Sequence, residues 1–457
     1  MPDPALWSRA LFGMSLGFHI VFATVGVGLP LMVALAEVLA LRRQDPYYRA
    51  MARRWAAAFS VFLGAGVVSG TIVAVQLSLL WPTFMRIVGQ IIALPFAIEV
   101  SAFFIEAVFT VIYVLAGHMI PAGWRIFSAF AVALGAAGSA VLITDVNAFM
   151  NTPTGFRLEG GQLTDIHPWR AMFNPSMPSE ISHVLATAYM TVAFVLAGFA
   201  CWGLGRVTSD EVRAYHARAL SLSMAVASAG AFLTALTGDG SGKFLAAVQP
   251  LKFAAAEGLF RTTSHAPLVI GGFPDAVTQT VRGGIEVPGM LSWLATGNRN
   301  GTVLGLQEFP RSEWPPLFVH LLFDVMVVIG GLALFVSALY WFFRLRRFSV
   351  PPHGLRTAVM AMGPLMFLGI EAGWVFAEIG RQPWTITGLL KTSDAVTSSS
   401  AYVTPLFFLF LGLYAVLAAG AAFALRRYVV THPLPDFLHA AGLGVHHAVA
   451  VKGGELG

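Results

Sequence analysis

Long apolar stretches separated by short polar connections make up most of the sequence. A helix that crosses the hydrocarbon layer of a membrane needs about 20 predominantly apolar residues, and several of these stretches are longer. The pattern predicts helices near residues 10–41, 55–80, 90–117, 124–146, 180–204, 217–236, 316–343, 357–379 and 401–425. We therefore expect an all-α fold, a polytopic membrane helix bundle of about nine transmembrane helices.

One connection differs from the others in length and composition. Residues 237–315 are polar and rich in Gly and Pro, from the run Gly238–Gly242 to the pair Pro315–Pro316. A loop of this length in a compact protein is more often functional than idle. The chain is thus predicted to consist of helices one to six in residues 1–236, this outer loop, helices seven to nine in 316–426, and a tail in 427–457.

The composition excludes a water-soluble protein. Of the 457 residues, 57% are hydrophobic and 11% are charged. A soluble domain carries roughly a quarter charged residues. The formal net charge of +5 comes from basic residues in short clusters between apolar runs, not from one extended basic face. We therefore expect a lipid bilayer around the chain and no nucleic-acid partner.

The basic clusters predict the orientation in the membrane. Lys and Arg gather in the first, fifth and seventh connections and in the C-terminal tail. The first connection alone holds Arg42, Arg43, Arg49, Arg53 and Arg54. Cytoplasmic loops carry an excess of Lys and Arg. The rule places the odd-numbered connections and the C-terminus in the cytoplasm, and the N-terminus and the loop 237–315 outside.

The cysteine count limits the kinds of site that the chain can hold. Cys201 is the single cysteine. It excludes an intrachain disulfide, a C-x-x-C-H attachment of haem and a cysteine-rich metal site. Any haem must therefore be held by His, Met or carboxylate side chains.

Ionisable residues inside the predicted helices are the candidates for function, because they are costly at membrane depth and usually face the bundle interior. They are His19, Glu99, Glu106, His183, Asp324, Glu371 and Glu378. Each also has a structural reading, since a lone His in a membrane helix is more often a packing residue than a ligand. Glu99 and Glu106 are two helical turns apart on one face, which suits a proton path or an interhelical hydrogen-bond pair.

Depth in the membrane favours the functional reading for four side chains. With the predicted orientation and a rise of roughly 1.5 Å per residue, all four fall in the outer half of the bilayer. They are His19, His183, Met326 and Glu378. Packing residues need not share a depth, whereas ligands that serve one electron path do. His with Met makes haem iron six-coordinate, and His or a carboxylate opposite an open position leaves iron able to take dioxygen.

At these residues the sequence resembles subunit I of the cytochrome bd family. Residues Glu371 to Trp384 read E-A-G-W-V-F-A-E-I-G-R-Q-P-W and are similar to the family segment E-A-G-W-x-x-x-E-x-G-R-Q-P-W nearly throughout. Gln249 to Glu257 is similar to the Q-x-x-K-x-A-x-x-E start of the family's quinol-binding loop. His19 stands at its N-terminal haem-ligand histidine. The resemblance covers essentially the whole chain.

The resemblance implies an oxidase that transfers electrons from quinol to dioxygen, forms water and contributes to the proton motive force. It implies that His183 and Met326 ligate a low-spin haem b. His19 and Glu378 would each hold one of two high-spin haems, a haem b and a haem d. Trp374 would lie between haems.

The resemblance also implies roles for residues around the haems. Glu99 and Glu106 would belong to the proton route, and Arg381 to the cofactor surroundings. Lys252 and Glu257 would contact quinol. A second membrane subunit, subunit II, would complete the enzyme in the bacterial cytoplasmic (inner) membrane, with room for small accessory subunits.

Two segments depart from the family pattern. Asp324 stands where the family usually has Arg, two residues before the haem Met, and residues 74–81 differ from the family segment E-F-Q-F-G-x-N-W. These departures leave open an oxygen reductase of the same family that takes electrons from a donor other than quinol. From the residues alone, a proton or cation transporter without haem is a further alternative, although the sequence has no repeated half.

Overall fold

A computed structural model describes residues 4–207, 209–348, 350–396 and 400–443 of the chain. Nine helices in these ranges are long and apolar enough to cross a membrane. They are α1 (Pro4–Arg43), α2 (Pro46–Leu80), α4 (Ala93–Val111, continued by a π-helical turn to Ala116), α5 (Ala122–Asn151), α7 (Met177–Leu204), α8 (Asp210–Val248), α11 (Val319–Leu345), α12 (His353–Ile379) and α14 (Ser400–Thr431). The predicted all-α membrane bundle is confirmed.

Local sequence signals explain where several of these helices begin. Asp45 precedes α2, its side chain accepts a hydrogen bond from the Tyr47 amide at 3.0 Å, and Pro46 follows at the first helical position. Ser209 caps α8 by accepting from the Val212 amide at 3.3 Å. Such caps satisfy amides that the helix itself leaves without partners.

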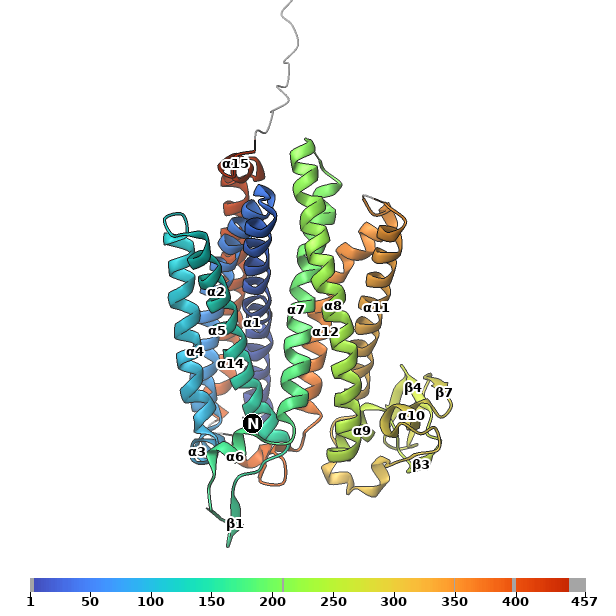
Figure 1. The fold of residues 1–457 in the computed structure, drawn as a ribbon. Helices are drawn as coiled ribbons and strands as arrows, with labels where there is room; N and C mark the ends of the chain where they lie inside the picture. The colour runs from blue at the N-terminus through green and yellow to red at the C-terminus, as the bar shows by residue number, and fades with distance from the viewer. Residues whose placement is uncertain (1–3, 208, 349, 397–399, 444–457) are drawn as a thin grey trace, which may run out of the picture.

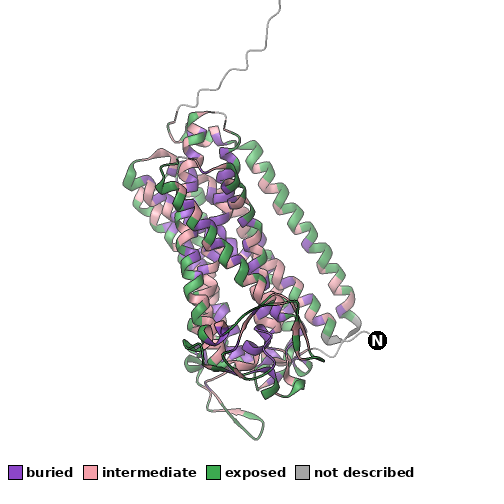
Figure 2. Ribbon diagram, turned by 90° about the vertical axis from the view of Figure 1, so that its right-hand side faces the viewer, coloured by how far each residue is buried: buried purple, intermediate pink, exposed green. Residues whose placement is uncertain are grey.

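The long helices form two groups that lie side by side (Figure 1). Helices α7, α8, α11 and α12 pack against one another, as do α1, α2, α4, α5 and α14. Contacts of α1 and α5 with α7 join the two groups. Buried residues line the interior and exposed residues cover the outer faces (Figure 2), as expected for helices that meet lipid or a partner.

Most short elements lie at one end of the bundle, which we call the loop end (Figure 1). It holds the start of α1 and the connection between α8 and α11. That connection contains α9 (Pro250–Ala256), α10 (Met290–Thr296) and the antiparallel strand pairs β3 (Thr263–Ser264) with β8 (Thr302–Val303), β4 (Leu268–Ile270) with β7 (Ile285–Val287) and β5 (Phe273–Asp275) with β6 (Thr280–Arg282).

Further short elements belong to the other connections. They are α3 (Pro82–Ile91), the hairpin β1 (Arg157–Glu159) with β2 (Gln162–Thr164), α6 (Pro168–Met172), the pair β9 (Trp384–Ile386) with β10 (Leu390–Lys391), and α13 (Thr392–Ala395). The opposite end of the bundle carries α15 (Leu434–Ala440), within the predicted tail. Residues 444–457 of that tail lie outside the described residues.

The predicted start of the outer loop is wrong. Helix α8 continues to Val248, so the run Gly238–Gly242 is helical and the connection begins at Gln249. The glycines misled the prediction because they usually end helices. Here Gly238 faces the His183 ring, and Asp239 pairs with Lys243 one turn later at 2.5 Å, which supports the helix.

Close helix packing at Gly28 yields a stability prediction. A Cβ atom at Gly28 of α1 would lie 2.5 Å from Val192 Cγ2 and 3.0 Å from the Ala188 carbonyl oxygen of α7. Gly28→Ala should therefore separate α1 from α7 and destabilise the protein by about 1–3 kcal/mol, the usual cost of overpacking. Thermal unfolding of the detergent-purified protein measures the loss. Gly26→Ala is the matched control, because no atom lies within 4 Å of its Cβ position. Equal stability of the two variants would contradict the packing argument.

Candidate functional site

The four candidate ligands all lie in the loop-end half of their helices. His183 and Met326 stand near the starts of α7 and α11, Glu378 stands at the end of α12, and His19 precedes the middle of α1. The structure thus places these four side chains toward the same end of the bundle, with His19 farthest from that end of its helix.

Each of the two histidines is held by a hydroxyl group of a neighbouring helix. His19 Nδ1 lies 3.0 Å from Ser69 Oγ of α2, and His183 Nδ1 lies 3.1 Å from Thr237 Oγ1 of α8. No hydrogen bond of either Nε2 is found among the described residues. Both rings therefore have one anchored nitrogen and one nitrogen that suits a metal.

Helix α12 carries Glu371 and Glu378 and is contacted by Met326 of α11. A Cβ atom at Gly373 would lie 3.0 Å from Met326 Sδ, so the thioether packs directly on the α12 backbone. Glu371 and Glu378 are two turns apart on one face of α12, with half-buried Trp374 one turn before Glu378. Glu371 approaches α1 at Gly17, where a Cβ atom would lie 3.1 Å from its Oε2.

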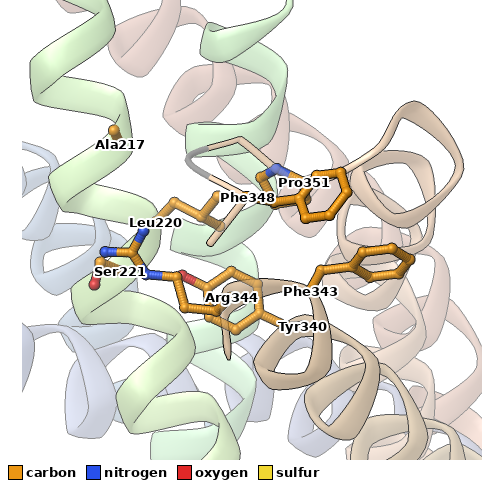
Figure 3. Close-up of a pocket in the computed structure, with 8 residues that line it drawn as sticks. All are labelled: Ala217, Leu220, Ser221, Tyr340, Phe343, Arg344, Phe348 and Pro351. Carbon is orange, nitrogen blue, oxygen red and sulfur yellow. The ribbon is translucent and has the colours of Figure 1, made fainter. Parts of the chain in front are cut away.

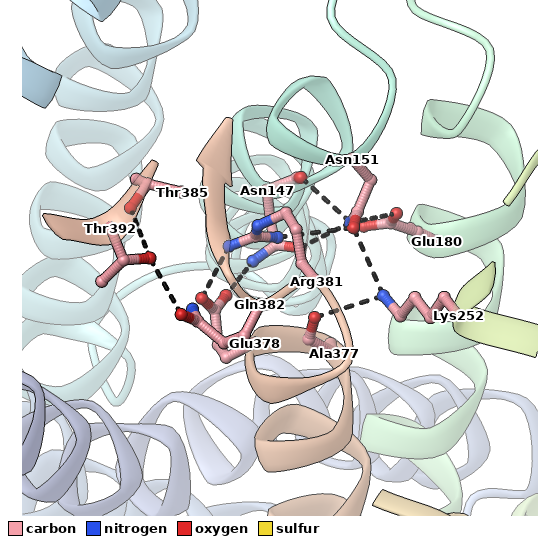
Figure 4. Close-up of polar contacts among 10 residues, drawn as sticks. All are labelled: Asn147, Asn151, Glu180, Lys252, Ala377, Glu378, Arg381, Gln382, Thr385 and Thr392. Carbon is pink, nitrogen blue, oxygen red and sulfur yellow. Dashed lines mark hydrogen bonds and ion pairs between the residues drawn. The ribbon is translucent and has the colours of Figure 1, made fainter. Parts of the chain in front are cut away.

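Glu378 belongs to a network of polar side chains from four elements (Figure 4). Asn147 of α5 donates to Glu378 Oε1, and Arg381 donates to Glu378 Oε2 at 2.7 Å. Arg381 also reaches Asn151 Oδ1 at 3.5 Å. Both carboxylate oxygens are thus oriented by donors, and each keeps a lone pair that could bind a metal.

Lys252 enters the same network from α9. Its Nζ donates to Asn151 Oδ1 at 3.3 Å and to the Ala377 carbonyl at 3.2 Å, while Asn151 donates to Glu180 at 2.9 Å (Figure 4). Burial lowers the pKa of Lys252 to about 8, although the charge of Glu180 acts in the opposite direction. Lys252 is 7% exposed, so it is not a solvated surface lysine.

Glu257 is also buried, but it faces a different environment. It follows α9 and is 5% exposed. Burial raises the pKa of Glu257 to about 8, and the neighbouring Asp324 adds to the rise. No contact joins Glu257 to Lys252 among the described hydrogen bonds and ion pairs. The two residues that the sequence analysis paired therefore serve separate surroundings.

Asp324, the residue that departs from the family pattern, anchors the loop. Its Oδ2 accepts from the Gly271 amide at 2.6 Å and lies 3.4 Å from His320 Nε2. His320 is fully buried, and its ring nitrogens face the carbonyl oxygens of Ala256 at 2.7 Å and Gly271 at 3.0 Å. A carbonyl oxygen can only accept, so a ring nitrogen that faces one must donate its N–H. Both ring nitrogens donate at once only in the imidazolium form, which Asp324 would balance as the opposite charge.

The paired glutamates of α4 both face α5, as their spacing predicts. Glu99 accepts from Ser139 Oγ at 2.7 Å. Glu106 is buried beside Gly135, where a Cβ atom would lie 2.8 Å from the Glu106 amide nitrogen. The Glu106 carbonyl accepts from Thr110 at 2.7 Å.

Several residues of the site were not among the residues predicted from the sequence. They are Ser69, Asn151, Glu180, Thr237 and His320. Glu180 looks like an ordinary acid in the first turn of a helix, and nothing in a single sequence links it to Lys252. The one available signal was position, since Glu180 precedes His183 by about one turn on the same helix face.

A small cavity elsewhere in the bundle is not part of this site. It lies near the start of α8 and the end of α11, where Ser221, Tyr340 and Arg344 contribute to its wall (Figure 3). Met326 stands near the start of α11, so the cavity and the candidate ligands lie toward opposite ends of that helix.

The donor set fits a haem better than a bare metal ion. Within the described ranges no group of three or more His, Cys, Asp or Glu side chains could hold a metal. Haem iron needs only one or two axial ligands from the protein. The buried atoms Glu371 Oε1 and Arg381 Nε have no hydrogen-bond partner in the described structure. Buried polar atoms rarely lack a hydrogen-bond partner. These two atoms therefore fit a site in which a bound group supplies the missing partner.

Comparison with known proteins decides the family. The model of the cytochrome bd terminal oxidase subunit I family matches residues 7–433. The chain belongs to this family. The predicted cytochrome bd-type oxidase is thereby confirmed in place of the transporter alternative, and the family implies haem cofactors. Subunit I of such an oxidase also implies a subunit II.

Named relatives and a solved structure cover nearly the whole chain. The putative cytochrome bd menaquinol oxidase subunit I of Bacillus subtilis (strain 168) is 46% identical over 442 residues, which are 96% of this chain and 99% of that protein. The cytochrome bd-II ubiquinol oxidase subunit 1 of Escherichia coli (strain K12) is 24% identical over 506 residues, covering 93% and 96%. The bd oxidase from Geobacillus thermodenitrificans has a TM-score of 0.89 at 45% identity, covering 94% and 99%.

The Asp324 anchor yields a prediction about loop mobility. Asp324→Ala removes a charged acceptor, a loss of about 1.5–3 kcal/mol, so local opening around Gly271 should increase roughly 10- to 100-fold. Hydrogen exchange of the Gly271 amide measures the opening. Asp324→Asn keeps an acceptor but not the charge and should fall between wild type and Ala. Glu286→Gln, an exposed change on β7, is the control. Unchanged exchange in Asp324→Ala would show that the anchor does not hold the loop.

Proposed function

We propose that this chain is the haem-bearing subunit of a quinol:dioxygen oxidoreductase. The observation that carries the proposal is that His19, His183, Met326 and Glu378 all lie in the loop-end half of their helices, at the end of the bundle where a buried segment holds Lys252 and Glu257. Relatives named menaquinol and ubiquinol oxidases support quinol as the donor.

Within this proposal His183 and Met326 would hold a low-spin haem b. His19 and Glu378 each hold one of two high-spin haems, a haem b and a haem d. The bound haems supply electron transfer and the reduction of dioxygen to water. Asn147 and Arg381 orient the Glu378 carboxylate. Trp374, one turn before Glu378 on α12, would lie between the haems.

Glu257 is the group that accepts a proton from quinol. Its buried position beside the loop keeps water away, and its raised pKa makes it a base near neutral pH. Lys252 lies on the inner side of the same segment and contacts quinol from there, where its charge balances Glu180 and Glu378. The two residues thus connect the quinol loop to the carboxylate that we assign to a haem.

Protons for dioxygen reduction come from the cytoplasm along α4 and α5. The polar groups along that interface that can carry protons are Glu106 and the hydrogen-bonded pair Glu99 and Ser139. Protons from quinol leave at the loop end, which we place outside the cytoplasmic membrane of a bacterium. Release on one side and uptake on the other contributes to the proton motive force. Subunit II, with any small accessory subunits, packs on the exposed apolar faces of this chain.

The ligand assignment predicts a spectroscopic result. His183→Ala or Met326→Leu should abolish the low-spin alpha band in reduced-minus-oxidised spectra of the purified two-subunit enzyme, because each removes one axial ligand. Met224→Leu, a volume-conserving change of a buried methionine in α8, is the control and should leave the band intact. A wild-type low-spin band in both ligand variants would reject the assignment, and colourless wild-type enzyme would reject the proposed function.

The raised pKa of Glu257 predicts the pH dependence of quinol oxidation. Only the carboxylate accepts a proton, so the turnover number should rise with pH through about 8. By linkage, neutral Glu257 contributes to stability below its ordinary pKa of 4.5, and this contribution is lost as the pH rises through about 8.

Glu257→Gln tests this dependence. Turnover should be low and nearly independent of pH in this range, whereas Glu313→Gln, a change of another acid in the same connection, should retain the wild-type profile. Steady-state oxygen consumption at saturating quinol from pH 6 to 9 gives the two profiles. A pH profile of Glu257→Gln that parallels the wild type would assign the proton acceptor elsewhere.

A further inference from the structure

The same local arrangement holds both candidate haem histidines. We propose that a hydroxyl residue followed by glycine, Ser69–Gly70 on α2 and Thr237–Gly238 on α8, positions His19 and His183 so that Nε2 of each ring is presented to iron. Ser69 and Thr237 are then positioning residues of two separate haem sites. The inference rests on the proposed function, because it requires that these histidines bind haem.

The His19 arrangement combines a hydrogen bond with a close approach. Nδ1 lies 3.0 Å from Ser69 Oγ, and Ser69 is fully buried. A Cβ atom at Gly70 would lie 2.9 Å from His19 Cε1, closer than a side chain tolerates. The ring therefore lies directly against the α2 backbone, in a space that only glycine leaves open.

The His183 arrangement repeats these contacts on another pair of helices. Nδ1 lies 3.1 Å from Thr237 Oγ1, and a Cβ atom at Gly238 would lie 3.4 Å from His183 Cε1. The ring contacts the residue after the hydroxyl, as it does in the first arrangement. Here the spacing is looser, at ordinary van der Waals distance.

The hydroxyl groups fix the direction of both hydrogen bonds. Ser69 Oγ lies 2.9 Å from the Ala65 carbonyl, and Thr237 Oγ1 lies 2.8 Å from the Leu233 carbonyl, each one turn earlier on its own helix. A hydroxyl has one proton, which it donates to that carbonyl. The oxygen must then accept from imidazole, so Nδ1 carries the ring proton and Nε2 keeps its lone pair.

Such a bond does more than hold the ring. A metal-bound histidine usually donates its other N–H group to a protein acceptor, which fixes the tautomer and makes the ring a stronger electron donor. A stronger donor stabilises ferric iron and lowers the reduction potential. A packing histidine could make the same Nδ1 bond, but its loss would not change any haem potential.

Thr237 provides the sharper test, because two substitutions separate the hydroxyl from the shape of the side chain. Thr237→Val should shift the midpoint potential of the low-spin haem upward in a redox titration of the purified two-subunit enzyme, while Thr237→Ser should keep the wild-type potential. Thr234→Val, one turn earlier on α8, is the matched control, since its buried hydroxyl has no partner in the described structure.

Ser69 is tested in the same way at the other site. Ser69→Ala should shift the potential of the high-spin haem held by His19 and leave the low-spin haem unchanged. Thr71→Val is its control, because the Thr71 hydroxyl also donates one turn back, to Val67 at 2.9 Å, but is exposed.

The glycines give an independent check. Gly70→Ala should displace the His19 ring and reduce or lose the haem at that site, whereas Gly238→Ala should retain its haem, as the distances of 2.9 and 3.4 Å require.

The outcomes separate this proposal from the proposed function. Thr237→Val with a wild-type potential, in an enzyme whose low-spin band is lost on His183→Ala, overturns the positioning role alone. A low-spin band that survives His183→Ala overturns the ligand assignment and with it this inference. A potential shift of equal size in Thr234→Val would also overturn the positioning role, because it would assign the effect to polarity in general.

Discussion

A polar group at membrane depth has no water to bind, and this constraint organises the whole structure. Charged and amide side chains there are therefore stabilised by partners elsewhere in the protein or in a bound group. The network around Glu378 meets the requirement by drawing together side chains that lie far apart in the sequence. They are Asn147, Asn151, Glu180, Lys252, Glu378 and Arg381. Because these residues come from α5, α7, α9 and the end of α12, the network also joins the two groups of helices. The site is therefore part of what holds the bundle together, not an addition to a finished scaffold.

The sequence predicts the helices well because the signal is local and long. Apolar length alone identifies each span, and the residue types and depth of His19, His183, Met326 and Glu378 follow from the same reading. The ends of helices and the partners of the ligands depend instead on contacts with distant segments. The sequence of the run that begins at Gly238 is typical of a loop. Its helical structure depends on packing against other helices, which includes the contact of Gly238 with the His183 ring. No periodicity along one helix indicates which hydroxyl or acid of another helix will face it.

The short helix α9 shows how a small element can serve two functions. Lys252 and Glu257 lie five residues apart, which on a helix separates their directions by about 140°, so their side chains leave the segment in different directions. Lys252 contacts the Glu378 network, whereas Glu257 lies beside Asp324 and the loop. A shift of α9 would disturb both at once. The loop beside Asp324 and the surroundings of Glu378 are thereby connected through one turn of helix.

Asp324 bears on the choice of electron donor. If Met326 holds a haem, as we propose, an unpaired carboxylate two residues away would stabilise ferric iron, lower the potential of that haem and make quinol a poor electron donor. Asp324 is not unpaired, because the imidazolium form of His320 lies 3.4 Å away and the Gly271 amide donates to it at 2.6 Å. The acid and its partner form a dipole whose field at Met326 is much weaker than that of a single charge. The substitution of Arg by Asp thus changes how the loop is anchored more than it changes the charge near the haem, and a quinol donor remains compatible with this chain.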